Sequence, residues 1–120
     1  MVYTSATLSL AALEYFVHLE PPEAPDDLVA VPAEIPDGVS RVRVDVSELP
    51  RNWRRYPASE AMADLGTRWA GTGATAVLIV PSAIIPAESN YLINPRHADF
   101  SKIRVGRPDR FSFDPRMWKR

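Results

Sequence analysis

Glu14 has the most unusual surroundings of any acid in this sequence of 120 residues. The apolar residues of the segment 8–19 project around most of a helix at about 100° per residue, so we expect a largely buried helix. Glu14 and His18 are its only acidic or basic side chains, one turn apart. A carboxylate among apolar neighbours loses solvation, and such groups are common in active sites. Glu14 is therefore a candidate catalytic residue, and the alternative is an exposed stripe where it pairs weakly with His18.

Ser82 is the second candidate catalytic residue. It follows the run Thr75 to Val80, whose β-branched and apolar residues are typical of a central strand buried on both faces. Ligand sites on sheets tend to lie where such strands end. A serine that caps a turn explains the same position, and no Gly-x-Ser-x-Gly elbow surrounds Ser82 to indicate a hydrolase of that kind.

The sequence contains no motif for cysteine chemistry, for metal binding or for a phosphate-binding loop. The chain has no cysteine, which excludes disulfides, thiolate metal sites and cysteine nucleophiles. His18 and His97 are too far apart for a local metal motif, so no metal is predicted. The glycines of Gly71-Thr72-Gly73 lack the spacing of a phosphate loop.

The first half of the chain has to position Glu14. We expect a short strand at Val2 to Thr4, then the helix, capped by Ser5 or Thr7 and running to about Leu19 before Pro21-Pro22. Two strand candidates follow, from Leu28 to Ile35 with Pro32 at an edge or bulge, and from Val39 to Val46 with one wet face.

The second half has to position Ser82. A helix is expected from Ala58 to about Trp69, ended by Gly71 or Gly73. Beyond the buried strand, the segment with Asn90 and Asn94 is rich in turn residues, and two short strands at 103–105 and 111–113 are expected to close a hairpin. These elements predict a single α+β domain over residues 1–120.

Composition limits the partners and the location. The formal net charge is −1, with no lysine or arginine before Arg41 and a basic tail from Arg96 onward. The near-neutral balance argues against direct nucleic-acid binding. No apolar run is long enough to span a membrane and no secretory signal opens the chain, so we expect a cytoplasmic protein. The acidic front and basic tail leave a homo-oligomer open.

Several blocks of this sequence, in order and spacing, resemble the RES domain family. They cover essentially the whole chain, and the most specific is the block from Asn90 to Pro95. The blocks are Val2-Tyr3-Thr4-Ser5, Ala12-Leu13-Glu14 with His18-Leu19, Val80-Pro81-Ser82-Ala83, Asn90-Tyr91-Leu92-Ile93-Asn94-Pro95 with His97 and Phe100, and Ile103-Arg104-Val105-Gly106 with Phe111 to Arg116.

The resemblance implies a toxin of a bacterial toxin-antitoxin pair, with an ADP-ribosyltransferase-like mixed sheet and flanking helices. Such toxins take NAD+ as substrate, which they consume by hydrolysis or phosphorolysis, or from which they transfer ADP-ribose to a protein. The implied partner is a helix-turn-helix (Xre-type) antitoxin that blocks the active site. An inactive RES fragment that only binds the antitoxin is the alternative.

The resemblance also assigns residues. Glu14 and Ser82 match the glutamate and serine of the family's name, and Tyr3 matches a tyrosine beside the nicotinamide. The family's arginine lies upstream of Val2, so we expect an N-terminally incomplete domain. A pyrophosphate needs cationic or amide donors, and the first forty residues hold no lysine or arginine, so weak or no turnover is expected from this chain alone.

If the site is intact, Glu14 stabilises the oxocarbenium-like state in which the nicotinamide–ribose bond breaks, or orients the nucleophile. Ser82 then hydrogen-bonds the ribose or the nicotinamide amide, and Tyr3 stacks on the ring.

Overall fold

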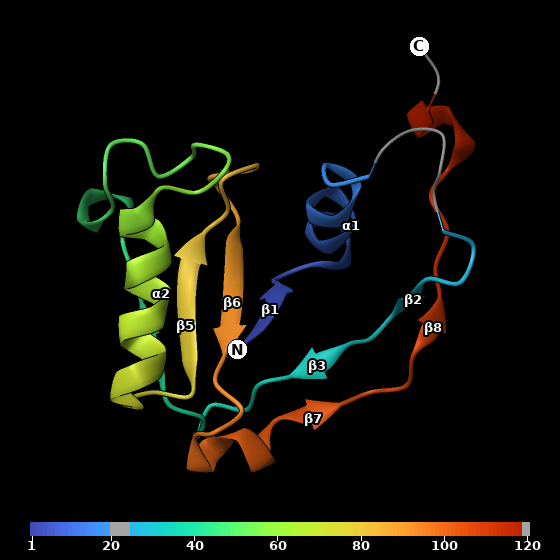
Figure 1. The fold of residues 1–120 in the computed structure, drawn as a ribbon. Helices are drawn as coiled ribbons and strands as arrows, with labels where there is room; N and C mark the ends of the chain where they lie inside the picture. The colour runs from blue at the N-terminus through green and yellow to red at the C-terminus, as the bar shows by residue number, and fades with distance from the viewer. Residues whose placement is uncertain (20–24, 119–120) are drawn as a thin grey trace.

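A four-stranded mixed sheet forms the centre of the computed structural model, which describes residues 1–19 and 25–118 (Figure 1). Strands β1 (Val2–Ser5) and β6 (Ser89–Ile93) pair antiparallel, as do β6 and β5 (Val77–Pro81). Strand β4 (Arg41–Arg43) pairs parallel with β5 at the other edge. This architecture confirms the expected α+β class with a mixed sheet.

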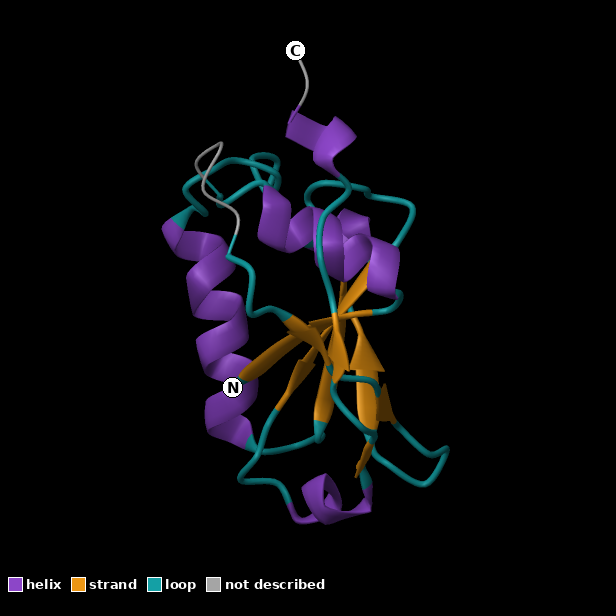
Figure 2. Cartoon of the chain, turned by 90° about the vertical axis from the view of Figure 1, so that its right-hand side faces the viewer, coloured by secondary structure: helices purple, strands orange, loops and turns teal. Residues whose placement is uncertain are grey.

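Two α-helices and several 3-10 helices lie around the strands (Figure 2). Helix α1 (Leu8–Phe16) begins after Thr7, whose hydroxyl accepts from the Leu10 amide at 3.1 Å. Helix α2 (Glu60–Thr72) ends at Gly73, whose φ of 63° suits a residue without a Cβ. Gly73, and not Gly71, therefore ends this helix. The 3-10 helices are η1 (Val46–Glu48), η2 (Ala98–Lys102) and η3 (Pro115–Trp118).

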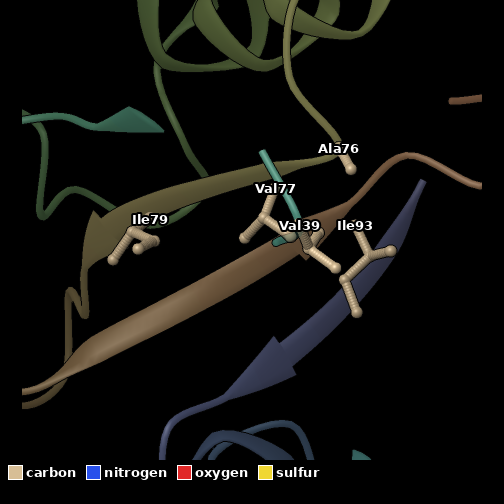
Figure 3. Close-up of a cluster of buried hydrophobic side chains, with 5 residues drawn as sticks. All are labelled: Val39, Ala76, Val77, Ile79 and Ile93. Atoms are coloured by element: carbon tan, nitrogen blue, oxygen red, sulfur yellow. The ribbon is translucent and has the colours of Figure 1, made fainter. Parts of the chain in front are cut away.

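The hydrophobic core gathers on the face of β5 and β6 that carries Val77, Ile79 and Ile93 (Figure 3). Val39 and Ala76 complete this cluster, and Val77 has no exposed surface. Strand β5 lies between β4 and β6, which confirms the predicted central strand. Its continuous apolar sequence is required because both of its faces are covered.

The opposite face of the sheet packs toward α2. Alternation along the strands places Leu78 of β5 opposite Leu92 of β6 on this face. The Leu92 side chain lies close to Gly66 of α2, where any Cβ would come within 3.9 Å of it. The helix is further tied down by Trp69, whose indole N–H donates to the Thr75 hydroxyl at 2.9 Å.

Helix α1 is shorter and more exposed than its sequence predicts. It ends at Phe16 instead of about Leu19, and the amides of His18 and Leu19 then bond three residues back, as in a tightened last turn. The proline pair expected to stop it lies outside the described residues. Of its residues only Leu10 is buried, because the helix packs along one side and borders an open groove on another.

The strand predicted from Leu28 to Ile35 is divided. It forms β2 (Val29–Ala30) and β3 (Ala33–Glu34), separated at Pro32, which has no amide to donate. The predicted hairpin near the C-terminus is wrong: β7 (Arg104–Val105) pairs with β3, and β8 (Asp109–Arg110) pairs with β2. The Pro32 carbonyl accepts from the Gly106 amide at 2.8 Å, so the two ladders form one long ribbon (Figure 1).

The strand predicted from Val39 to Val46 is reduced to the three residues of β4. Asp45 stops it by capping η1: its carboxylate accepts from the Ser47 amide, and the Glu48 carboxylate accepts from the Asp45 amide. Val42 remains 41% exposed at the sheet edge, so the expected buried side of this strand is only partly covered.

The turns predicted around Asn90 are wrong, because this stretch contains β6, an inner strand of the sheet. Asparagine favours turns when its side chain bonds to nearby backbone. Here the side chain of Asn90 bonds to residues far away in the sequence, Ser5, Tyr3 and Glu14, and the extended backbone is retained.

Asp99 fastens η2 to the start of β4. Its carboxylate accepts from the Ser40 amide at 2.9 Å and lies 3.0 Å from the Lys102 ammonium. The backbone bond from Ser40, followed by the bond from Lys102, lowers the pKa of Asp99 from its ordinary value of 3.8 to about 2. The ionised form is therefore the one that stabilises the native state.

We predict that Asp99→Asn lowers the melting temperature near neutral pH, because the charged acceptor is lost. The native pKa is the lower one, so the contribution of Asp99 is present above pH 3.8 and is lost as the pH falls toward about 2. Thermal unfolding followed by circular dichroism should show the two proteins converging over this range. A difference that stays constant from pH 7 to pH 2 would contradict the assignment.

Candidate active site

Strand register brings three polar residues to one face of the sheet. Tyr3 of β1 lies opposite Leu92, and Asn90 of β6 lies opposite Val80. Alternate residues of a strand share a face, so Tyr3, Asn90 and Leu92 point the same way. Ser82, two residues after Val80, continues this face just beyond β5. The polar residues therefore meet where β5 ends and β6 begins.

The Glu14 carboxylate of α1 lies against these three residues. Its Oε1 accepts from the Ser82 hydroxyl at 2.9 Å and from the Asn90 amide at 3.1 Å. Its Oε2 accepts a longer bond, 3.4 Å, from the Tyr3 hydroxyl. One oxygen is thus held firmly, whereas the other retains acceptor capacity for a ligand.

The alternative interpretation of Glu14 as half of a weak pair with His18 does not describe this geometry. The His18 ring instead packs against Tyr56, with centroids 5.5 Å apart. The predicted pair Glu14 and Ser82 is brought into direct contact, and Tyr3 joins it.

Ser82 is both a turn cap and a partner of Glu14. It has no exposed surface, and its Oγ accepts from the amides of Ile84 and Ile85, each at 3.1 Å. These two bonds fix the hydroxyl oxygen, so its hydrogen is directed to Glu14. The turn-cap alternative is therefore correct as local structure and compatible with a role at the site.

Asn90 is the site residue that was not assigned from the sequence. It is 1% exposed and makes a bond with each of its neighbours: its Oδ1 accepts from the Ser5 hydroxyl, and its Nδ2 donates to Tyr3 and Glu14. The bond from Ser5 orients the amide so that the donor side faces the carboxylate. The available signal is the family resemblance, whose most specific block begins at Asn90.

The pKa of the Tyr3 phenol is raised, so the phenol holds its proton at neutral pH. Partial burial of the phenol, the nearby charge of Glu14 and the bond to that carboxylate, in this order, raise its pKa from 10.0 to about 12, against a smaller opposite effect of the bond from Asn90. The phenol is therefore a hydrogen-bond donor to Glu14 at neutral pH, while the side chain as a whole is 57% exposed.

Glu14 and Tyr3 line a cavity of about 590 Å³ between α1, α2, the sheet and the loop 50–58. Ligand pockets commonly measure roughly 300–1,000 Å³. Among the described lining residues Glu14 is the only acid, Arg54 and Arg55 are the arginines, and His18 is the histidine. Ser82 and Asn90 do not line it, so they hold the carboxylate from behind.

A larger groove of about 910 Å³ lies on the other side of α1, beside β2 and β8. Leu8, Tyr15 and Phe111 are among its residues, and Glu14 is not. The smaller cavity is therefore the one that brings a ligand to the hydrogen-bonded carboxylate.

No group of three or more histidine, aspartate or glutamate side chains within the described ranges could hold a metal ion. His97 has a structural contact instead, because its Nδ1 accepts from the Asp99 amide at 2.9 Å and caps η2. Among the helices of these same ranges, none is long and apolar enough to cross a membrane.

Comparison with known proteins identifies the family of the chain. The RES domain family model matches residues 1–114. The "Prs ADP-ribosylating toxin" of Sphingobium sp. (strain YBL2) is 38% identical over 119 residues, which cover 98% of this chain and 74% of that protein. The chain belongs to the RES domain family, as its sequence blocks predicted.

Two further relatives are named "Toxin Res". The protein of Yersinia enterocolitica is 34% identical over 117 residues, covering 97% of this chain and 76% of that protein. The protein of Pseudomonas putida is 36% identical over 122 residues, covering 98% and 79%.

We predict that the phenol of Tyr3 ionises near pH 12, and that Glu14→Gln lowers this pKa because the neighbouring negative charge is removed. The phenolate absorbance of Tyr3 can be isolated as the difference between the parent protein and Tyr3→Phe, with the same pair compared in the Glu14→Gln background. Ionisation of Tyr3 near pH 10 in the parent protein would contradict the contact with Glu14.

Proposed function

We propose that this protein is a toxin that cleaves the nicotinamide–ribose bond of NAD+. The observation that supports this most strongly is a carboxylate with three hydrogen-bond donors at the wall of a cavity that also holds two arginines. The names of the relatives support the toxin function, and one of them is named as ADP-ribosylating.

Glu14 is the proposed catalytic residue. When the bond between C1′ of the ribose and the nicotinamide nitrogen breaks, the nicotinamide leaves with the electron pair and the ribose becomes oxocarbenium-like. The negative charge of Glu14 stabilises this cation, with Oε2 free to accept from a ribose hydroxyl. An oxygen of water or phosphate then bonds to C1′; the proton of an attacking water passes to solvent.

Ser82 and Asn90 are proposed as positioning residues. They are buried, lie outside the cavity lining and both donate to Oε1. Two donors on one oxygen hold the carboxylate in a single orientation. This favours the reaction, because the carboxylate then needs little reorganisation to reach the transition state. The hydrogen bond from Ser82 to the ribose or the nicotinamide amide, which the family resemblance implies, stays a prediction.

Tyr3 is proposed to lie beside the nicotinamide. Its ring borders the cavity and is more than half exposed, so an aromatic surface is available next to Glu14. The tyrosine hydroxyl meanwhile stays bonded to the carboxylate.

A toxin of this type requires an inhibitor in the cell that makes it. We propose a helix-turn-helix antitoxin that covers the open cavity, and the cytoplasm as the place where NAD+ and both proteins meet. The names of the relatives as toxins support the pairing.

We predict that Glu14→Gln reduces the rate of NAD+ loss by on the order of 10²-fold or more, because the charge that stabilises the oxocarbenium-like state is removed. NAD+ can be followed by chromatography with the purified chain. Glu60→Gln serves as the matched control, since Glu60 lies outside the cavity lining. Because weak turnover is expected of this chain alone, the assay uses a high protein concentration, and measurable NAD+ loss that is equal in the parent protein and Glu14→Gln would overturn the assignment.

The acceptor can be identified in the same reactions. ADP-ribose formed without phosphate indicates hydrolysis, and a phosphorylated ADP-ribose formed only with phosphate indicates phosphorolysis. Label transferred to protein indicates ADP-ribosylation. All three outcomes use the same bond cleavage.

We predict that Ser82→Ala lowers kcat by about 10- to 100-fold with little change in KM, because the carboxylate loses its shortest bond while the cavity lining is unchanged. Ser101→Ala is the matched control, since Ser101 is exposed and bonds only to the Ala98 carbonyl among the described residues. Steady-state kinetics separates the two constants. A change confined to KM would show that Ser82 contacts the substrate directly.

A further inference from the structure

The loop between η1 and α2 carries four consecutive residues, Trp53 to Tyr56, that all line the cavity of Glu14. The loop is ordered by its own backbone: the Trp53 amide donates to the Pro50 carbonyl at 3.0 Å, and the Arg55 amide donates to the Asn52 carbonyl at 2.9 Å. This part of the cavity wall is therefore a turn of defined shape.

Arg54 ties this loop to the turn that holds Ser82. Its Nε donates to the Ala83 carbonyl at 2.7 Å, and its Nη2 donates to the Ile84 carbonyl at 3.4 Å. The amide of Ile84 in turn bonds to Ser82. The guanidinium of Arg54 is thus occupied in fixing the loop next to the carboxylate site.

Tyr56 ties the other end of the loop to the end of α1. Its ring packs against His18, with centroids 5.5 Å apart and planes inclined by 52°. The loop is therefore anchored on both sides of Arg55, once at the Ser82 turn and once beside the helix that carries Glu14.

Arg55 lies between these two anchors and lines the cavity. Its guanidinium has neither an ion pair nor a side-chain hydrogen bond with any described residue, in contrast to that of Arg54. Arg55, which is exposed, thus brings to the cavity lining a guanidinium without a partner among the described residues, whereas Glu14 on the same lining is already bonded to three donors. A planar guanidinium recognises phosphate oxygens by paired hydrogen bonds.

We propose that Arg55 binds the pyrophosphate of the dinucleotide while the nicotinamide ribose lies at Glu14. This inference rests on the proposed function and deepens it, because it names the group that recognises the phosphates. The loop before α2 then supplies a cation for the phosphates, whereas the first forty residues hold no lysine or arginine.

Binding can be separated from turnover in the Glu14→Gln background. Isothermal titration calorimetry measures the affinity of NAD+, which has a pyrophosphate, and of nicotinamide riboside, which has none. Arg51→Ala is the matched control, because Arg51 belongs to the same loop and is exposed but does not line the cavity.

The expected result is that Arg55→Ala weakens NAD+ binding by on the order of 10- to 100-fold and leaves nicotinamide riboside binding unchanged. Arg51→Ala should leave both affinities unchanged. Arg55→Lys should recover part of the NAD+ affinity, because a point charge remains without the paired donors. The dependence of NAD+ binding on salt should also become weaker in Arg55→Ala.

Equal NAD+ affinity in Arg55→Ala and its parent would overturn the inference and leave the proposed function standing. An equal loss of both ligands would also overturn it, since the effect would then be on the cavity as a whole. Failure of the parent to bind either ligand would instead overturn the proposed function, and this inference with it.

Discussion

The hydrogen bonds to the Glu14 carboxylate connect segments that are far apart in the chain. Ser82 comes from the end of β5, Asn90 from β6 and Tyr3 from β1, while Glu14 itself comes from α1. An acid partly removed from water is stable only if donors replace the lost hydration. The site therefore requires correct pairing of β1, β6 and β5, and any shift of register by one residue would turn Tyr3 or Asn90 to the wrong face.

The same arrangement divides the site into a buried support and an open side. Ser82 and Asn90 lie behind the carboxylate, where Ser5 and the amides of the following turn orient them. Tyr3 and the loop with Arg54 and Arg55 border the cavity. A ligand in this cavity thus meets one carboxylate with a fixed orientation, together with Arg54 and Arg55 of the loop. This charge pattern suits the proposed substrate, which carries a cationic nicotinamide ring and an anionic pyrophosphate.

Local sequence patterns predicted the elements whose causes are local. The apolar run before Pro81 identified the central strand, Thr7 caps α1 and Gly73 ends α2, each being one of the two residues expected there. Local sequence patterns gave wrong predictions where contacts between residues far apart in the chain determine the secondary structure or the strand pairing. Asn90 is typical of turns, yet its bonds to Ser5, Tyr3 and Glu14 hold it in a strand. Similarly, the C-terminal strands pair with residues 29–34 instead of with each other. The contact of Arg54 with the turn after Ser82 also depends on tertiary structure, so spacing alone could not indicate a basic wall near Glu14.

The central claim is that NAD+ places its nicotinamide ribose at Glu14 in the cavity beside the loop 50–58. A crystal structure of Glu14→Gln with NAD+ tests this most directly, because turnover is suppressed while the shape of the side chain is kept. The ribose is expected within hydrogen-bond distance of residue 14, with Tyr3 beside the nicotinamide. NAD+ bound instead in the larger groove between α1 and β2, away from residue 14, would contradict it.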